Sequence, residues 1–452
     1  MKSTLVILLF AVLLSAQTPS LDLPQWVGEI ERALENELGA WYPRCVDTLH
    51  GGCLTQFDAE WREQQRQDKM IVTQARCVWT AAKAAMLYPQ DERFRLAAEH
   101  GFAFLRGKMW DAEYGGFFQM RTRDGGAVET GYRDEKRVYG NAFGLYAAAA
   151  NYELTRDPQA LDFAREIFHW IEKTAYDPQY GGYFDFILRD GRVLGRGYKS
   201  EAGDSLRFGY KDQNPTIHLL EAYSELYRVW PDSLLRERLA ALLSLVRDVI
   251  TSEHGYMRLF FTPDWTPISH RDSTEAFILE SYGLDHISFG HDIETAYLLL
   301  EASNALGLEN DEVTLRAAKK TVDFVLDHGW DEQNGGVYHA GYWFKDESAP
   351  RVIKTEKDWW AQAEALNSLL MMSLLFPDEP RYQQAFVRQW AYVKTFLIDW
   401  QHGSWYSLGL DTRPDARTAF KAHAWKGPYH TGRALMNVLK MVRTGRLFDA
   451  AR

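Results

Sequence analysis

Three histidines lie at the same phase of a repeat, each close to the start of a predicted helix that is rich in small and apolar residues. They are His218, His291 and His430. Imidazole has a pKa of about 6.5, so it can serve as general acid or general base at neutral pH. The pattern therefore predicts proton transfer, with His291, His430 and His218 as the candidate catalytic residues.

Side chains that suit a sugar recur at the same position of the predicted helices. Arginine, tyrosine, asparagine and glutamate can hydrogen-bond hydroxyl groups, and tryptophan faces pack against sugar rings. Aromatic residues make up 14% of the chain, enough to line a binding cleft. The candidate substrate-binding residues are Arg76, Tyr139, Asn214, Glu294, Trp359, Trp360 and Trp425.

Some of these residues also have a purely structural interpretation. Asn214 precedes Pro215, as a helix N-cap precedes a proline in the first turn, so its side chain either caps a helix or binds the ligand. His218 lies four residues later on the same helix face and could satisfy a hydrogen bond of the core. Glu294 follows His291 by three residues, and its carboxylate would either orient the imidazole or pair with it on a solvated face.

The tandem tryptophans Trp359 and Trp360 raise a similar question. Core packing is a common role of tryptophan. Adjacent residues of a helix point in different directions, so both side chains cannot face one cleft. We therefore expect one of the pair to line the cleft.

A glycine-containing, aromatic-rich turn occurs six times along the chain. Glycine accepts the positive φ of a tight turn and aromatic residues suit short strands, so each turn predicts a hairpin. Two helical patterns, with apolar residues at every third or fourth position, lie between successive turns. The turns occupy residues 50–57, 114–118, 180–184, 254–256, 334–338 and 402–406.

Six units of helix, hairpin and helix predict an all-α fold, an (α/α)6 barrel of inner and outer helices with short β-hairpins at one end. The second helix of each unit is rich in small and apolar residues, as in 142–150, which suits an inner helix packed on all sides. Equivalent positions of the six units would then meet in one cleft. No linker divides the chain after residue 20, so we expect residues 17–452 to form a single catalytic domain.

Composition and local motifs limit the partners. The formal net charge of -11 argues against nucleic acid, which needs a basic surface. The sequence has no HExxH or CxxC motif and no glycine-rich nucleotide-binding loop, so neither a metal nor a cofactor is expected. The expected partner is a small-molecule sugar, bound by a monomer or a weak dimer.

Residues 1–16 resemble a secretory signal peptide. A lysine precedes an apolar run over residues 5–14, which is too short to span a membrane and is followed by two small residues. We therefore expect export, with the periplasm as the destination. The three cysteines, Cys45, Cys53 and Cys77, permit a bridge between Cys45 and Cys53 in an oxidising compartment without requiring one.

Five motifs, in order along the chain, resemble the N-acylglucosamine 2-epimerase superfamily. They are YGNAF at 139–143, NPTIHLLEAY at 214–223, FGHDIE at 289–294, WWAQAE at 359–364 and WKGPYH at 425–430. The resemblance spans nearly the whole chain after the N-terminal segment. It implies an (α/α)6 barrel without metal or cofactor, and reversible inversion at C2 of the reducing-end glucose of β-1,4-linked disaccharides of the cellobiose, lactose or mannobiose type.

The resemblance also implies roles for individual residues. His430 and His291 match the family's acid/base pair, and His218 matches a histidine that assists ring opening. Two histidines on opposite faces of a planar enediolate would allow the proton at C2 to leave one face and return to the other. Arg76, Tyr139 and Asn214 match contacts to the reacting sugar, and Trp360 and Trp425 match stacking platforms. Glu294 matches a carboxylate beside the second histidine. Gly427 and the pair Asn214–Pro215 depart from the family pattern and bear on disaccharide specificity.

Other functions remain open on the sequence. Return of the proton to C1 instead of C2 would make the protein a mannose isomerase, and a closed cleft would make it a monosaccharide 2-epimerase acting on mannose or an N-acylglucosamine. The same barrel hosts glycoside hydrolases, which need a pair of carboxylates. A non-catalytic sugar-binding protein would keep the tryptophans but would have no use for the histidines.

Overall fold

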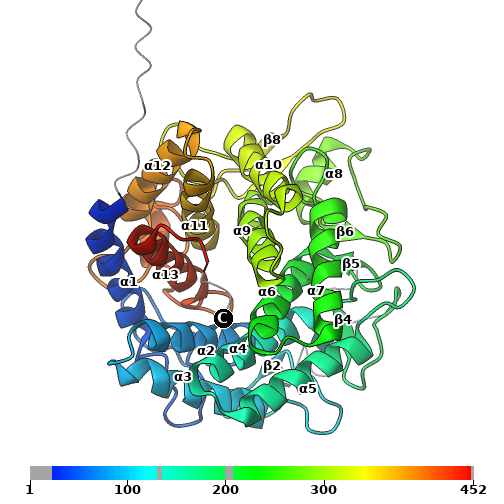
Figure 1. The fold of residues 1–452 in the computed structure, drawn as a ribbon, viewed down its shortest axis with the longest axis vertical. Coiled ribbons are helices and arrows are strands. Elements are labelled where there is room, and N and C mark those ends of the chain that lie inside the picture. The colour runs from blue at the N-terminus through cyan, green and yellow to red at the C-terminus, as the bar shows by residue number, and fades with distance from the viewer. Residues whose placement is uncertain (1–22, 130–134, 199–206, 449–452) are drawn as a thin grey trace, which may run out of the picture.

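Twelve long helices alternate between two concentric layers in the computed structural model, which describes residues 23–129, 135–198 and 207–448 (Figure 1). The outer layer comprises α1 (Val27–Trp41), α3 (Glu92–Phe104), α5 (Pro158–Thr174), α7 (Ser233–Leu245), α10 (Glu312–His328) and α12 (Pro380–Phe396). The inner layer comprises α2 (Ile71–Leu87), α4 (Val138–Thr155), α6 (Gln213–Val229), α9 (Phe289–Ala305), α11 (Trp359–Leu375) and α13 (Tyr429–Thr444). Each inner helix contacts the next, and α13 contacts α2, so the inner layer is a closed ring. The predicted (α/α)6 barrel is confirmed.

The inner helices carry small and apolar residues on all sides, which allows them to pack against neighbours in every direction. In α4 every residue from Val138 to Asn151 is buried. Gly144 lies so close to Phe117 that an added Cβ would fall 2.2 Å from its ring, which explains why only glycine fits there. The outer helices are amphipathic; α5 buries Phe163 and Ile167 and exposes its opposite face.

The glycine turns differ from the predicted hairpins. Each turn is closed by one antiparallel bridge. In five of the six units the preceding helix ends one or two residues before the bridge and leaves no room for a longer strand, whereas α1 ends five residues before Val46. The bridges are Val46–Cys53, Trp110–Phe117, Tyr176–Tyr183, Thr251–Met257, Trp330–Val337 and Ile398–Trp405.

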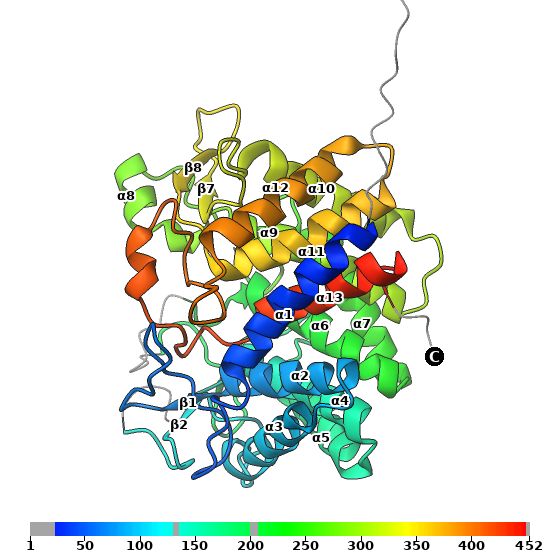
Figure 2. The same ribbon diagram turned by 90° about the vertical axis from the view of Figure 1, so that its left-hand side faces the viewer.

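The named strands mostly connect neighbouring units. The pairs are β1 (Lys69–Met70) with β2 (Met120–Arg121), β3 (Glu135–Arg137) with β4 (Phe186–Leu188), and β5 (Lys211–Asp212) with β6 (Phe260–Phe261). Among the described residues, β7 (Ala340–Tyr342) and β8 (Arg351–Lys354) form a hairpin within one unit. In Figure 2 the labelled strands β1, β2, β7 and β8 and the short helix α8 (Glu275–Glu280) lie at one end of the barrel, opposite the end at which α13 finishes.

A buried ion pair fastens five of the six turns to the inner helix that follows. In the second unit, the Asp111 carboxylate accepts hydrogen bonds from the backbone of Glu113 and Tyr114, and Lys136 Nζ lies 2.9 Å from Asp111 Oδ2. Lys136 also donates to the carbonyl of Gly115. The other four pairs are Asp47–Lys69, Asp177–Lys211, Asp331–Lys357 and Asp399–Lys421. The fourth unit has Ser252 and Ile287 at these positions.

We expect Lys136→Met to lower the free energy of unfolding by about 2 kcal/mol, because the buried Asp111 carboxylate would lose its ammonium partner and keep only the partly exposed Arg189 guanidinium, whose Nε lies 2.8 Å from Asp111 Oδ2. Urea denaturation measures this change. Lys108→Met, which alters an exposed lysine of the same unit, should be close to neutral. A loss below about 1 kcal/mol for Lys136→Met would contradict the proposed role of the pair.

The N-terminal segment, residues 1–16, lies outside the described residues. In the described part of the chain, no helix combines the length and the apolar character that a membrane span requires. All three cysteines are free and buried there, so the structure contains no bridge between Cys45 and Cys53.

Candidate active site

The candidate residues meet at the end of the barrel where the inner helices begin. Arg76 Nη2 of α2 donates to the Tyr139 hydroxyl of α4 at 3.1 Å, and the Tyr139 ring lies 5.3 Å from that of His218 on α6. Across the ring, Trp360 of α11 lies 4.8 Å from His291 on α9. The centroid of the same indole lies 5.8 Å from the centroid of the His430 imidazole on α13. Six inner helices therefore each contribute at least one side chain to one site.

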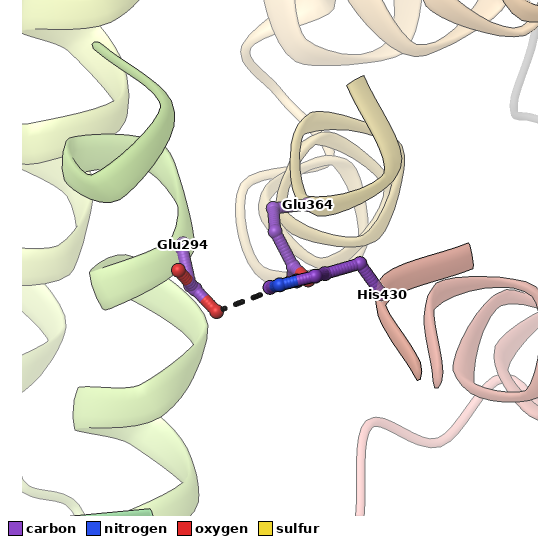
Figure 3. Close-up of side chains that lie close together, drawn as sticks. All are labelled: Glu294, Glu364 and His430. Atoms are coloured by element: carbon purple, nitrogen blue, oxygen red, sulfur yellow. Dashed lines mark hydrogen bonds and ion pairs between the residues drawn. The ribbon is translucent and has the colours of Figure 1, made fainter. Parts of the chain in front are cut away.

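His430 is held by a carboxylate from the neighbouring helix. Its Nδ1 lies 2.7 Å from Glu364 Oε1 of α11 and 3.9 Å from Glu294 Oε1 of α9. Figure 3 shows the two carboxylates and the imidazole converging from three helices. All three residues are buried. The position of His430 is therefore set by contacts with two other helices.

His218 and His291 are fixed in the same manner by local partners. His218 Nδ1 lies 2.9 Å from Glu221 Oε2, one helical turn further along α6. His291 Nδ1 lies 2.8 Å from Ser288 Oγ, just before α9. With Nδ1 engaged in all three rings, Nε2 is the nitrogen left to exchange a proton with a substrate.

Arg433 lies beneath the histidines at the centre of a cluster of carboxylates. Its guanidinium donates to Glu294 Oε1 at 2.7 Å, lies 2.8 Å from Glu364 Oε1, and also bonds Glu221 and the Tyr429 hydroxyl. Arg433 and the three glutamates are almost completely buried. Arg433 and Glu221 were not among the site residues predicted from the sequence. The available signal was a charged residue three positions after His430 and another three after His218, inside otherwise apolar helices.

Burial governs the protonation of the site. It lowers the pKa of His291 to about 3, with His218 adding a smaller effect, and lowers the pKa of His430 well below its usual value, with help from Arg76 and Arg433. Burial raises the pKa of Glu364 to about 8. For Glu221, Arg433 and His218 outweigh burial and lower the pKa to about 2. Neutral imidazoles at pH 7 follow for His291 and His430, as a base requires.

The structure distinguishes the two tandem tryptophans. Trp360 lies between His291 and His430 and is partly exposed. Trp359 is buried, packs edge-on against His423 at 5.8 Å, and leaves its Nε1 without a partner. Trp360 is therefore the one that lines the site.

Asn214 does not cap its helix. Asp212 is the N-cap of α6, and its carboxylate accepts from the Asn214 backbone N–H at 2.9 Å. The side-chain oxygen of Asn214 is buried without a hydrogen-bond partner. The capping interpretation was wrong, and the free amide oxygen is consistent with a ligand contact.

Trp425 reaches the site on an inserted turn. In the second unit, Lys136, the lysine of the buried ion pair, stands two residues before the inner helix α4. In the last unit, the corresponding Lys421 stands eight residues before α13. The additional residues fold back, with the backbone N–H of Lys426 donating to the carbonyl of His423 at 2.9 Å. Trp425, at the tip, is 45% exposed and lies 6.4 Å from the Tyr139 ring, at the rim of the site.

Glu294, Glu364 and His430 also lie close enough together to hold a metal ion. However, the Arg433 guanidinium already contacts the Oε1 atoms of both carboxylates. The positive charge that a metal would supply is thus provided by the protein, and the donor set does not fit an additional cation.

The chain is similar to known carbohydrate epimerases and isomerases. The sequence profile of N-acylglucosamine 2-epimerase (GlcNAc 2-epimerase) matches residues 52–434. A cellobiose 2-epimerase from Bacteroides fragilis is 28% identical over 404 residues, which cover 88% of this chain and 94% of that protein. A D-mannose isomerase from Thermobifida fusca is 25% identical over 319 residues, covering 68% of this chain and 70% of the relative.

Solved structures have the same fold. The cellobiose 2-epimerase from Bacillus thermoamylovorans superposes with a TM-score of 0.78 at 25% identity, covering 93% of this chain and 99% of that one. The profile match extends over most of the chain and includes every candidate site residue. The chain therefore belongs to the N-acylglucosamine 2-epimerase family of carbohydrate isomerases.

Proposed function

We propose that this protein catalyses reversible C2 epimerisation of the reducing-end glucose of β-1,4-linked disaccharides, converting cellobiose to glucosyl-mannose. The observation that carries the proposal is the pair His291 and His430, on helices either side of α11, each close to the Trp360 ring between them. Both imidazoles lie beside this ring, so a sugar bound next to Trp360 would have two acid/base groups within reach.

The proposed reaction begins with opening of the sugar ring, assisted by His218. One of His291 and His430 then removes the proton from C2, which leaves a planar cis-enediolate, and the other returns a proton to C2 from the opposite face. Arg76 and Tyr139 would donate hydrogen bonds to the oxygens on which negative charge develops. His218, backed by Glu221, would move protons at the ring oxygen.

A disaccharide is favoured over a monosaccharide by Trp425 and by the relatives. The exposed indole lies outside the ring of buried catalytic groups, where a second sugar would extend from the first. The Bacteroides fragilis relative is a cellobiose 2-epimerase. Glu294 and Glu364 are both bonded to Arg433, which leaves them poorly suited to the acid and nucleophile roles of a glycoside hydrolase.

Mannose isomerase activity is the second candidate, supported by the Thermobifida fusca relative. The same residues would produce a ketose if the proton returned to C1. NMR after incubation in deuterated water with EDTA, on cellobiose and separately on mannose, distinguishes the reactions. We expect glucosyl-mannose carrying deuterium at C2, formed without added metal. Product from mannose alone would assign the protein to the monosaccharide branch, and no product in the presence of EDTA would overturn the metal-independent mechanism.

We expect Trp425→Ala to raise the KM for cellobiose about tenfold, because the second sugar would lose its stacking surface. Turnover of mannose should change less than about twofold, since the reacting ring does not need this indole. Initial-rate kinetics on both sugars measure the difference. Trp400→Ala removes a tryptophan of equal exposure elsewhere and serves as the control. Equal losses on both sugars would contradict the assignment.

We also propose export to the periplasm, supported by the signal-like residues 1–16. Cell fractionation with N-terminal sequencing tests this. Mature protein in the cytosol that retains its first residues would overturn it.

A further inference from the structure

Two half-buried histidines outside the proposed catalytic set lie near His291. His286 stands five residues before His291 on the segment that enters α9, and His339 immediately precedes β7. Ile287 and Gly341 exchange backbone hydrogen bonds of 2.8 and 2.9 Å, which hold these two segments side by side. The imidazoles are nearly parallel, with an interplanar angle of 15° and centroids 6.2 Å apart.

In each of these imidazoles, Nδ1 forms a hydrogen bond with another group of the protein. His286 Nδ1 lies 3.1 Å from the Tyr282 carbonyl oxygen, so it donates and leaves a lone pair on Nε2. His339 Nδ1 lies 2.6 Å from Asp358 Oδ2, just before Trp359 at the start of α11. An imidazole oriented by a carboxylate or a carbonyl has its second nitrogen prepared for an external partner.

The pair is accessible and close to the reacting groups. The side chain of His339 is 32% exposed, and His286 is partly exposed. Both rings are near enough to His291 to contribute to lowering its pKa, after burial and His218. Nothing in the proposed proton transfer uses either ring.

We propose that His286 and His339 are specificity-determining residues, which hydrogen-bond through Nε2 to hydroxyl groups of the sugar ring outside the reacting one. This inference rests on the proposed disaccharide activity and concerns a part of the substrate that a monosaccharide lacks. Sugar hydroxyls both donate and accept, so they match two imidazole nitrogens in either protonation state. The parallel arrangement would bind two hydroxyls of one ring.

The variants His286→Phe and His339→Phe keep an aromatic ring and remove Nε2. We expect each to raise the KM for cellobiose about tenfold with kcat within about twofold of wild type. The inhibition constant of free mannose should be unchanged, because mannose fills the reacting position only. His100→Phe is the control, since His100 is another partly exposed histidine held by a backbone carbonyl, that of Asp47.

The outcomes separate this inference from the proposed function. Unchanged KM for cellobiose in both variants would overturn the role of the pair and leave the epimerase intact. Weaker binding of mannose in parallel with cellobiose would also overturn it, by placing the effect at the reacting ring. A wild-type protein that epimerises mannose but neither binds nor converts disaccharides would refute the disaccharide subsite, whereas wild-type binding of cellobiose without turnover would refute the epimerase alone.

Discussion

Replacing either His291 or His430 with asparagine should lower the rate of epimerisation by about 1,000-fold, because general acid or base catalysis on one face of the sugar is lost. The two variants should differ in what remains. Each keeps the imidazole that serves the other face, so each should still exchange the C2 proton of one epimer with solvent. The epimer whose C2 proton still exchanges should be glucosyl-mannose in one of the variants His291→Asn and His430→Asn, and cellobiose in the other.

NMR in deuterated water measures both quantities, starting once from cellobiose and once from glucosyl-mannose. Deuterium would enter C2 of one starting sugar without inversion, and the double variant should show neither exchange nor inversion. Circular dichroism checks that the variants fold. If both single variants lose exchange with both epimers, the two-base mechanism fails and a single base acting on both faces becomes the better account.

Arg433→Met is expected to cause the largest loss of stability, at least about 4 kcal/mol of unfolding free energy, together with loss of activity. The guanidinium contacts Glu221, Glu294 and Glu364, and all four groups are buried. Removal of the cation would leave the carboxylates without charge compensation beneath the histidines. Arg443→Met removes an exposed arginine of the same helix and should have little effect.

The pH dependence of this loss has a definite sign. In the wild type, the folded pKa of Glu221 is lowered to about 2 from 4.5, so its stabilising contribution is present above pH 4.5 and disappears as pH falls through 2. Without Arg433, burial alone would raise the folded pKa of the carboxylates. The free-energy cost of burying these ionised carboxylates is absent below pH 4.5 and grows as pH rises. The variant should therefore be more stable at pH 5 than at pH 8.

Urea denaturation at the two pH values measures the effect. Arg433→Met combined with Glu294→Gln should recover part of the loss, because one of the uncompensated charges is removed. A loss that is independent of pH and is not relieved by the second substitution would show that Arg433 acts through packing rather than charge.

Much of the fold was predictable because it depends on local patterns that repeat. The alternation of amphipathic segments with segments rich in small residues identified outer and inner helices, and the six glycine turns identified the units. The hairpin prediction was less successful. A turn glycine indicates a reversal of the chain, but it carries no information about which segments pair beyond it. Strands such as β1 and β2 come from consecutive units, and only their packing brings them together.

The candidate site was predictable to the extent that it follows helix phase. Arg76, Tyr139, His218, His291, Trp360 and His430 lie within the first two turns of six inner helices, and closing the ring brings them together. The helical pattern could not show whether Trp359 or Trp360 faces the site, because it does not fix how α11 is rotated about its own axis. It also could not show that Asp212, rather than Asn214, caps α6.

The sequence by itself therefore determined the helices, their layers and the position on each helix from which a functional side chain projects. These properties arise from periodic burial within one segment, which adjacent residues control. Only the tertiary structure decided which charges compensate each other. Arg433 on α13 reaches Glu221 on α6 and Glu294 on α9, and His430 reaches Glu364 on α11. Such pairings depend on the closure of the ring, which brings together residues between 66 and 212 positions apart.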